Sequence, residues 1–98
     1  MSTELERAIG RVVEGTRHWS PARWSSKAEP MHALVQRLAD LTADAEGRPR
    51  RAVPRLPNDM NLPDQLQVIG LDLLEAELTE TQRAQAEAAV QRARAALF

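Results

Sequence analysis

Residues 47–61 read GRPRRAVPRLPNDMN, and this stretch divides the chain into two helical halves. Three prolines lie between positions 49 and 57, and each proline removes a backbone donor and fixes φ. We therefore predict an extended, polyproline-like connection between two helices, and we call residues 47–61 the strap. The strap carries four arginines, whereas the overlapping segment 59–80 carries six carboxylates and no Lys or Arg.

Apolar residues recur at three- and four-residue steps on both sides of the strap, which predicts helices at about 3–19, 30–46, 63–78 and 80–97. Capping boxes are expected to open three of them, because a hydroxyl and a Glu or Gln side chain can satisfy two free amides. The pairs are Thr3 with Glu6, Ser26 with Glu29, and Thr79 with Gln82. Gly47 is expected to close the second helix in the left-handed conformation.

The predicted fold is all-α: one domain, residues 1–98, forming a small four-helix bundle with the Arg/Pro-rich strap as a long crossover between the second and third helices. The third helix is apolar around most of its circumference, so we expect it to be the most buried, with Asp72 and Glu75 on a narrow wet side. The fourth helix is rich in alanine, which buries little area per residue. We therefore expect it to need another surface to pack against, either from its own chain or from a partner.

Composition limits the classes of function. The 98 residues are 43% hydrophobic, enough for one core, and the net charge of −1 gives no general attraction to nucleic acids or membranes. The absence of cysteine excludes disulfides, thiolate metal sites and cysteine nucleophiles. No apolar run approaches the roughly 18 residues of a membrane helix, and the N-terminus lacks a secretory signal, so the predicted location is the cytoplasm.

The strap allows three interpretations. Residues 51–57 match R-x-x-P-x-x-P, a pattern that polyproline-binding modules recognise. Alternatively, its guanidinium groups bind phosphates. In the third interpretation the strap packs on its own domain. Its arginines would then face carboxylates of the third helix, namely Asp64, Asp72, Glu75 or Glu77.

The aromatic and histidine residues give weaker signals. Trp19 follows the apolar stripe of the first helix and is predicted to be core, whereas Trp24 is expected either to close an end of the bundle or to anchor a partner. His18 and His32 show no metal-ligand spacing and no catalytic partners. We predict no catalytic residue, cofactor or metal.

These observations favour a non-catalytic helical interaction or adaptor module, whose partner is a second copy or another protein. The carboxylates near Asp72 form either a solvated helix face or a docking surface for a basic partner. The alternative is a nucleic-acid-associated regulator that binds phosphates through the strap and the arginines of the fourth helix. The candidate partner-binding residues are Arg48, Arg50, Arg51, Arg55, Trp24, Asp72, Glu75 and Arg92.

Overall fold

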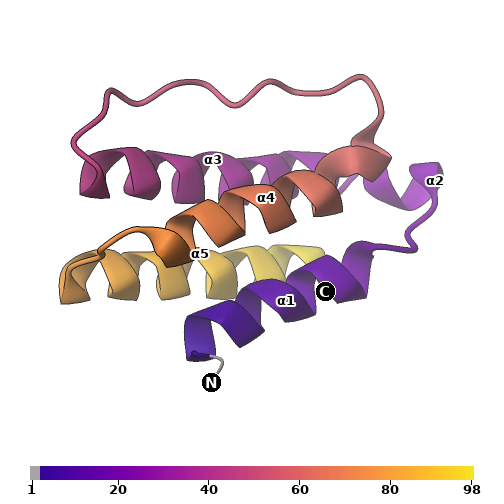
Figure 1. Cartoon of the computed structure of the whole chain (residues 1–98). Helices are drawn as coiled ribbons and strands as arrows, with labels where there is room; N and C mark the ends of the chain where they lie inside the picture. Colours follow the sequence, from indigo (N-terminus) through magenta and orange to yellow (C-terminus); the bar gives the residue numbers. More distant parts are fainter. Residues whose placement is uncertain (1–2) are drawn as a thin grey trace.

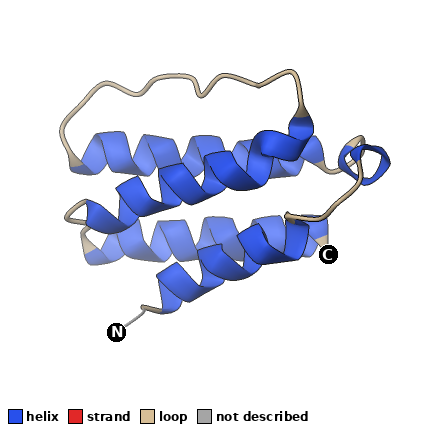
Figure 2. Cartoon of the chain, turned by 45° about the vertical axis from the view of Figure 1, so that its right-hand side comes forward, coloured by secondary structure: helices blue, strands red, loops and turns tan. Residues whose placement is uncertain are grey.

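The computed structural model describes residues 3–98, and within this range the chain is all-α, as predicted, with no strand. Residues 1 and 2, which belong to the predicted domain, lie outside the described part. Four long helices are joined by two short ones (Figure 2). Their bounds are α1 Glu4–Thr16, α2 Pro21–Trp24, α3 Ala28–Ala45, η1 Asp59–Asn61, α4 Leu62–Glu75 and α5 Glu80–Leu97. None of the helices described is long and apolar enough to span a bilayer.

The strap returns the chain along the whole length of α3 before α4 begins (Figure 1). As a result α3 and α4 run parallel, whereas α1 and α5 run in the opposite direction. α3 packs against both α4 and α5, and α1 packs against α4 and, less extensively, against α5. The predicted bundle with a crossover between two helix pairs is therefore the observed arrangement.

The core is built from one stripe of each long helix. α3 contributes the longest buried stripe, and the α5 stripe lies where the three- and four-residue spacing predicts. Burying one such aliphatic side chain stabilises the fold by about 1.5–3 kcal/mol. Fully buried members include Leu5, Val12, Met31, Val35, Leu38, Leu66, Leu73, Val90 and Leu97.

Local signals fix most helix ends. Gly47 has φ of 68° and follows α3, as predicted. The capping box of Thr79 and Gln82 is complete at the start of α5. At α1, the Thr3 hydroxyl accepts from the Glu6 amide at 3.1 Å.

The prediction of a capping box formed by Ser26 and Glu29 is wrong. α3 begins at Ala28 after Lys27, whose side chain makes no capping hydrogen bond. A turn at residues 25–27, directly after α2, shifts the helix start past Ser26.

The first predicted helix is also too long. It ends at Thr16, whose hydroxyl donates to the Val12 carbonyl at 2.8 Å. Ser20 then acts as the N-cap of the short helix α2, with Pro21 at its first position. This Ser-Pro pair favours a new helix start over continuation of the old one.

The prediction that the third helix is the most buried is wrong as well. Two apolar residues of α4 point outward: Val68 is 59% exposed and Leu71 is 53% exposed. The helix also ends at Glu75 rather than at residue 78, because Ala76 adopts an extended conformation before the Thr79 cap.

Candidate protein-docking surface

Three of the four strap arginines are held in short-range ion pairs. Arg50 donates to both carboxylate oxygens of Asp44, at 3.0 and 2.7 Å, and Arg55 pairs with Asp59 at 3.2 Å. Arg48 pairs with Glu46. The hydrogen bonds from Arg50 lower the pKa of Asp44 below its usual value; desolvation opposes this shift, and the charges of Arg50 and Arg37 add to it.

None of the strap arginines forms an ion pair with Asp64, Asp72, Glu75 or Glu77 within residues 3–98, although Arg48 and Arg51 line a groove together with Asp72 of α4. The carboxylates they do contact lie only two to six residues away in sequence. Pairing with partners so close in sequence costs little loop-closure entropy, which favours these carboxylates over those on α4. Arg51 is exposed and has no carboxylate within ion-pair distance in residues 3–98.

The middle of the strap is fastened to the bundle through its backbone. The side-chain amide of Gln36 accepts from the Val53 amide at 2.7 Å and donates to the Arg51 carbonyl at 3.0 Å. His32 Nε2 lies 3.0 Å from the Val53 carbonyl, and Gln65 Nε2 donates to the Pro54 carbonyl at 3.1 Å. The strap is therefore an ordered part of the fold.

Both tryptophan side chains belong to the core. Trp24 is 1% exposed and Trp19 is 7% exposed, with 4.9 Å between their ring centroids. Arg23 covers the Trp19 ring at 4.3 Å, and Phe98 meets the same ring edge-on at 5.7 Å. Trp19 is core, as predicted, and Trp24 contributes to the core rather than offering its indole to a partner.

Arg92 lines a groove between α3 and α5, together with Pro30, Ala33 and Arg37 of α3, and no strap arginine lines that groove. Pro30 and Ala33 also line a neighbouring hollow beside Arg55 of the strap.

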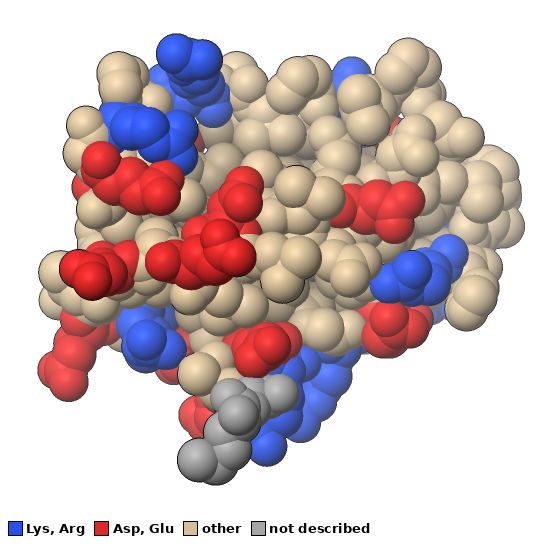
Figure 3. Space-filling model, viewed as in Figure 1, with Lys and Arg blue, Asp and Glu red and all other residues tan. Residues whose placement is uncertain are grey.

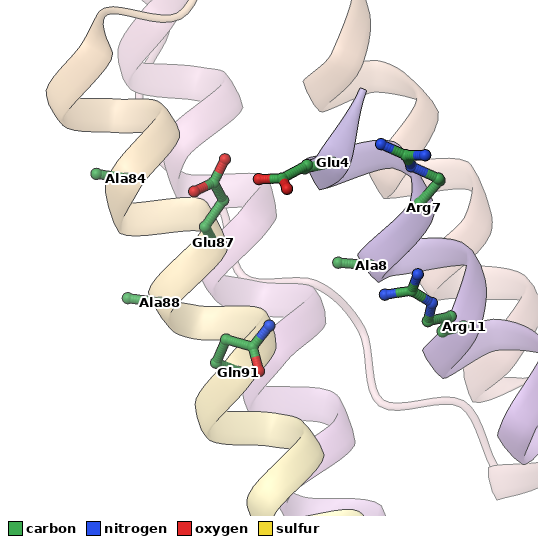
Figure 4. A pocket seen from close by; sticks show the side chains of 8 residues that line it. All are labelled: Glu4, Arg7, Ala8, Arg11, Ala84, Glu87, Ala88 and Gln91. Atoms are coloured by element: carbon green, nitrogen blue, oxygen red, sulfur yellow. The ribbon is translucent and has the colours of Figure 1, made fainter. Parts of the chain in front are cut away.

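A second groove, between α1 and α5, is polar. Glu4 of α1 and Glu87 of α5 extend toward one another across it, and Arg7 and Arg11 lie on the α1 side (Figure 4). Charges of both signs share this groove, and no ion pair crosses it within the described residues. In the same range no three His, Asp or Glu side chains lie close enough together to hold a metal ion.

Asp72 and Glu75 have a different setting, because they share the outer side of α4 with exposed apolar residues. Val68 and Leu71 are the most exposed large apolar residues apart from the C-terminal Phe98. Asp72 and Glu75 are themselves exposed, and neither takes part in an ion pair within residues 3–98.

A shallow groove of about 180 Å³ runs between α1 and α4 beside these residues. Its apolar lining comes from both helices: Ile9, Gly10 and Val13 of α1, and Gly70, Leu71 and Leu74 of α4. Glu6 and Glu14 of α1 also line it. Figure 3 views this side of the molecule, where carboxylates are spread around an uncharged central area. We call this groove, together with Val68, Asp72 and Glu75, the α1/α4 face.

The two glycines of the groove differ. A Cβ atom at Gly70 would lie 3.0 Å from Cγ2 of the buried Ile9, so a side chain there would require Ile9 to shift by a few tenths of an ångström. A Cβ atom at Gly10 would meet nothing within 4 Å. Glycine inside a helix costs about 1 kcal/mol relative to alanine, and packing within the chain does not require it at Gly10.

The sequence analysis found Asp72 and Glu75 but missed Val68 and Leu71. Both belong to the apolar circumference that led us to expect the third helix to be the most buried. At 100° per residue, Val68 lies about 200° around the helix from Leu66, and Glu75 about 180° from it. A helical wheel centred on Leu66 would therefore have placed Val68 with the carboxylates.

Comparisons with known proteins found no matching family model, no matching curated protein and no matching solved structure. The function is therefore inferred from the surface of this chain alone.

Proposed function

We propose that this chain is a non-catalytic interaction module that binds another protein through the α1/α4 face. The observation that carries the proposal is the exposure of Val68 and Leu71, one turn apart, beside an apolar groove. Covering their exposed parts would contribute about 1 kcal/mol each, since full burial of such a side chain is worth about 1.5–3 kcal/mol. We propose the cytoplasm as its location, in keeping with a chain that has no cysteine.

The charge on this face favours a different protein over a second copy as the partner. In a twofold dimer the same patch meets itself, so Asp72, Glu75 and Glu6 would approach their own equivalents. Like charges brought together at an interface oppose association. The free protein is therefore expected to be monomeric by light scattering at micromolar concentration.

The nucleic-acid alternative has less support. Arg48, Arg50 and Arg55 each have a carboxylate partner, so their charge is largely compensated where a phosphate would bind. The remaining candidates are Arg51, which is exposed and unpaired within residues 3–98, and Arg92, which lines a groove between α3 and α5 that no strap arginine lines. A mobility shift with DNA or RNA at about 50 mM salt that weakens as salt rises would favour this alternative instead.

Selection from a random peptide library tests the proposal whichever protein the partner is. The affinity of the peptides enriched on the wild-type protein is then measured for the wild type and for the double variant Val68→Ser/Leu71→Ser. The matched control is Leu56→Ser, which removes a partly exposed leucine from the strap. We expect binding to fall in the double variant and to persist in the control. Enriched peptides that bind both variants equally well would refute the α1/α4 face as the docking site.

A further inference from the structure

The charge around the α1/α4 face indicates the chemistry of its partner. Glu6 and Glu14 line the groove on the α1 side, whereas Asp72 and Glu75 lie on α4. α4 contains three carboxylates and no Lys or Arg. On the α1 side, Arg17 is already engaged, because it pairs with Glu14 at 3.1 Å and donates to Gln67 at 3.3 Å. On the other side of α4, Arg48 and Arg51 line a groove together with Asp72, and Arg48 is paired with Glu46. The apolar centre is thus flanked by carboxylates on both helices.

The shape of the face suits a helix. The groove lies between two helices, and Val68 and Leu71 form a short apolar ridge along its α4 edge. Side-chain ridges of one helix pack into the grooves of another, at interaxial distances of about 8–10 Å. Gly10 offers a side-chain-free stretch of the α1 wall, where a backbone can come close. The outer side of α4 from Asp64 to Glu75, which contains this ridge, is roughly 17 Å long, the length of about 11 helical residues.

We propose that the partner segment is a cationic amphipathic helix, with apolar residues that enter the α1/α4 groove and Lys or Arg on its flanks that meet Glu6, Asp72 and Glu75. This inference rests on the proposed function, since it specifies the partner of the same face. Exposed ion pairs of this kind are individually weak and are screened by salt. Their main effects are therefore on specificity and on the salt dependence of binding.

Three synthetic 14-residue peptides test the charge. All carry leucine at the same helical positions, and the remaining positions are Lys, Gln or Glu. We expect the Leu/Lys peptide to bind about tenfold more tightly than the Leu/Gln peptide at low salt, the Leu/Glu peptide to bind most weakly, and the Lys advantage to shrink at 0.5 M salt. Amide shifts in NMR spectra are expected to map to residues around Gly10 and Leu71.

Matched charge variants separate local contacts from diffuse attraction. Asp72→Asn/Glu75→Gln removes two carboxylates from the face, and Glu29→Gln/Glu46→Gln removes two from α3 and its C-terminal end with the same change in net charge. Only the first pair is expected to reduce Leu/Lys binding. Equal reduction by both pairs, equal affinity for the Leu/Lys and Leu/Gln peptides, or no Leu/Lys binding would overturn the inference. The library selection with Val68→Ser/Leu71→Ser decides the proposed function separately.

Discussion

Replacing Gly10 by alanine is expected to stabilise the fold, whereas the same change at Gly70 is expected to destabilise it. Both glycines lie inside helices, where alanine is favoured by about 0.5–1 kcal/mol. At Gly10 the new methyl group meets no atom within 4 Å, so the full gain is expected. For a domain of this size that gain raises Tm by about 2–8 °C.

At Gly70 the methyl group would lie 3.0 Å from a side-chain carbon of Ile9, which is only 4% exposed. Overpacking of a core typically costs about 1–3 kcal/mol, which exceeds the helix-propensity gain. Thermal and urea unfolding of the two variants are therefore expected to place them on opposite sides of the wild type. A Gly70→Ala protein as stable as Gly10→Ala would refute the close α1–α4 approach.

Gly10 links the stability of the fold to the docking of a partner helix. Gly10→Leu keeps a good helix former on α1 but fills the groove, so it is expected to preserve the fold and weaken binding of the Leu/Lys peptide. Unchanged binding in Gly10→Leu would show that no helix approaches α1 at this point. Chemical-shift mapping of the variant identifies whether the peptide has moved elsewhere.

The other predictions concern the core and the strap. Trp24→Ala is expected to destabilise the fold by about 3–5 kcal/mol in urea unfolding, because the indole is fully buried; a loss below about 1 kcal/mol would contradict this. Gln36→Ala removes the side chain that holds the strap backbone, so hydrogen exchange at the Val53 amide is expected to accelerate while amides in the middle of α5 stay protected; unchanged exchange at Val53 would mean that other contacts hold the strap. The pKa of Asp44 is lowered in the folded state. Its pairing with Arg50 therefore stabilises the fold at pH values above the ordinary pKa of 3.8, and this stabilisation is lost as the pH falls through the lowered pKa. NMR titration of the Asp44 carboxyl is expected to show a midpoint below that value, and Arg50→Gln is expected to return it upward; an unshifted midpoint in the wild type would disprove the pairing in solution.

The helix pattern was predictable because it depends on neighbours in sequence. The start of α5 follows from the Thr79–Gln82 pair, and the end of α3 from Gly47. The exposed half of α4 was harder to predict. Apolar residues occupy more than one side of that helix, and only packing against α1 and α3 decides that Leu66 is buried and Val68 is not.

The candidate site was predictable only in part. A segment rich in carboxylates pointed to Asp72 and Glu75, but the groove beside them depends on how closely α1 approaches α4, which no local signal specifies. The strap arginines were the most conspicuous residues in the sequence. The charges of Arg48, Arg50 and Arg55 are nevertheless compensated by Glu46, Asp44 and Asp59, because carboxylates close in sequence pair with them at little loop-closure cost; Arg51 stays unpaired within residues 3–98.

The parallel course of α3 and α4 sets a minimum length for the connection between them. α3 has 18 residues and is about 27 Å long, and residues 46–58, at about 3.1 Å each in polyproline geometry, cover roughly 40 Å. Once the distance between the end of α3 and the start of α4 is spanned, the connection has only about three or four residues more than it needs. Deletions beyond that limit would force α4 to reverse direction, whereas insertions cost little, since doubling a loop adds only about 0.6 kcal/mol. Natural or engineered variants of this fold are therefore expected to lengthen this connection far more readily than they shorten it.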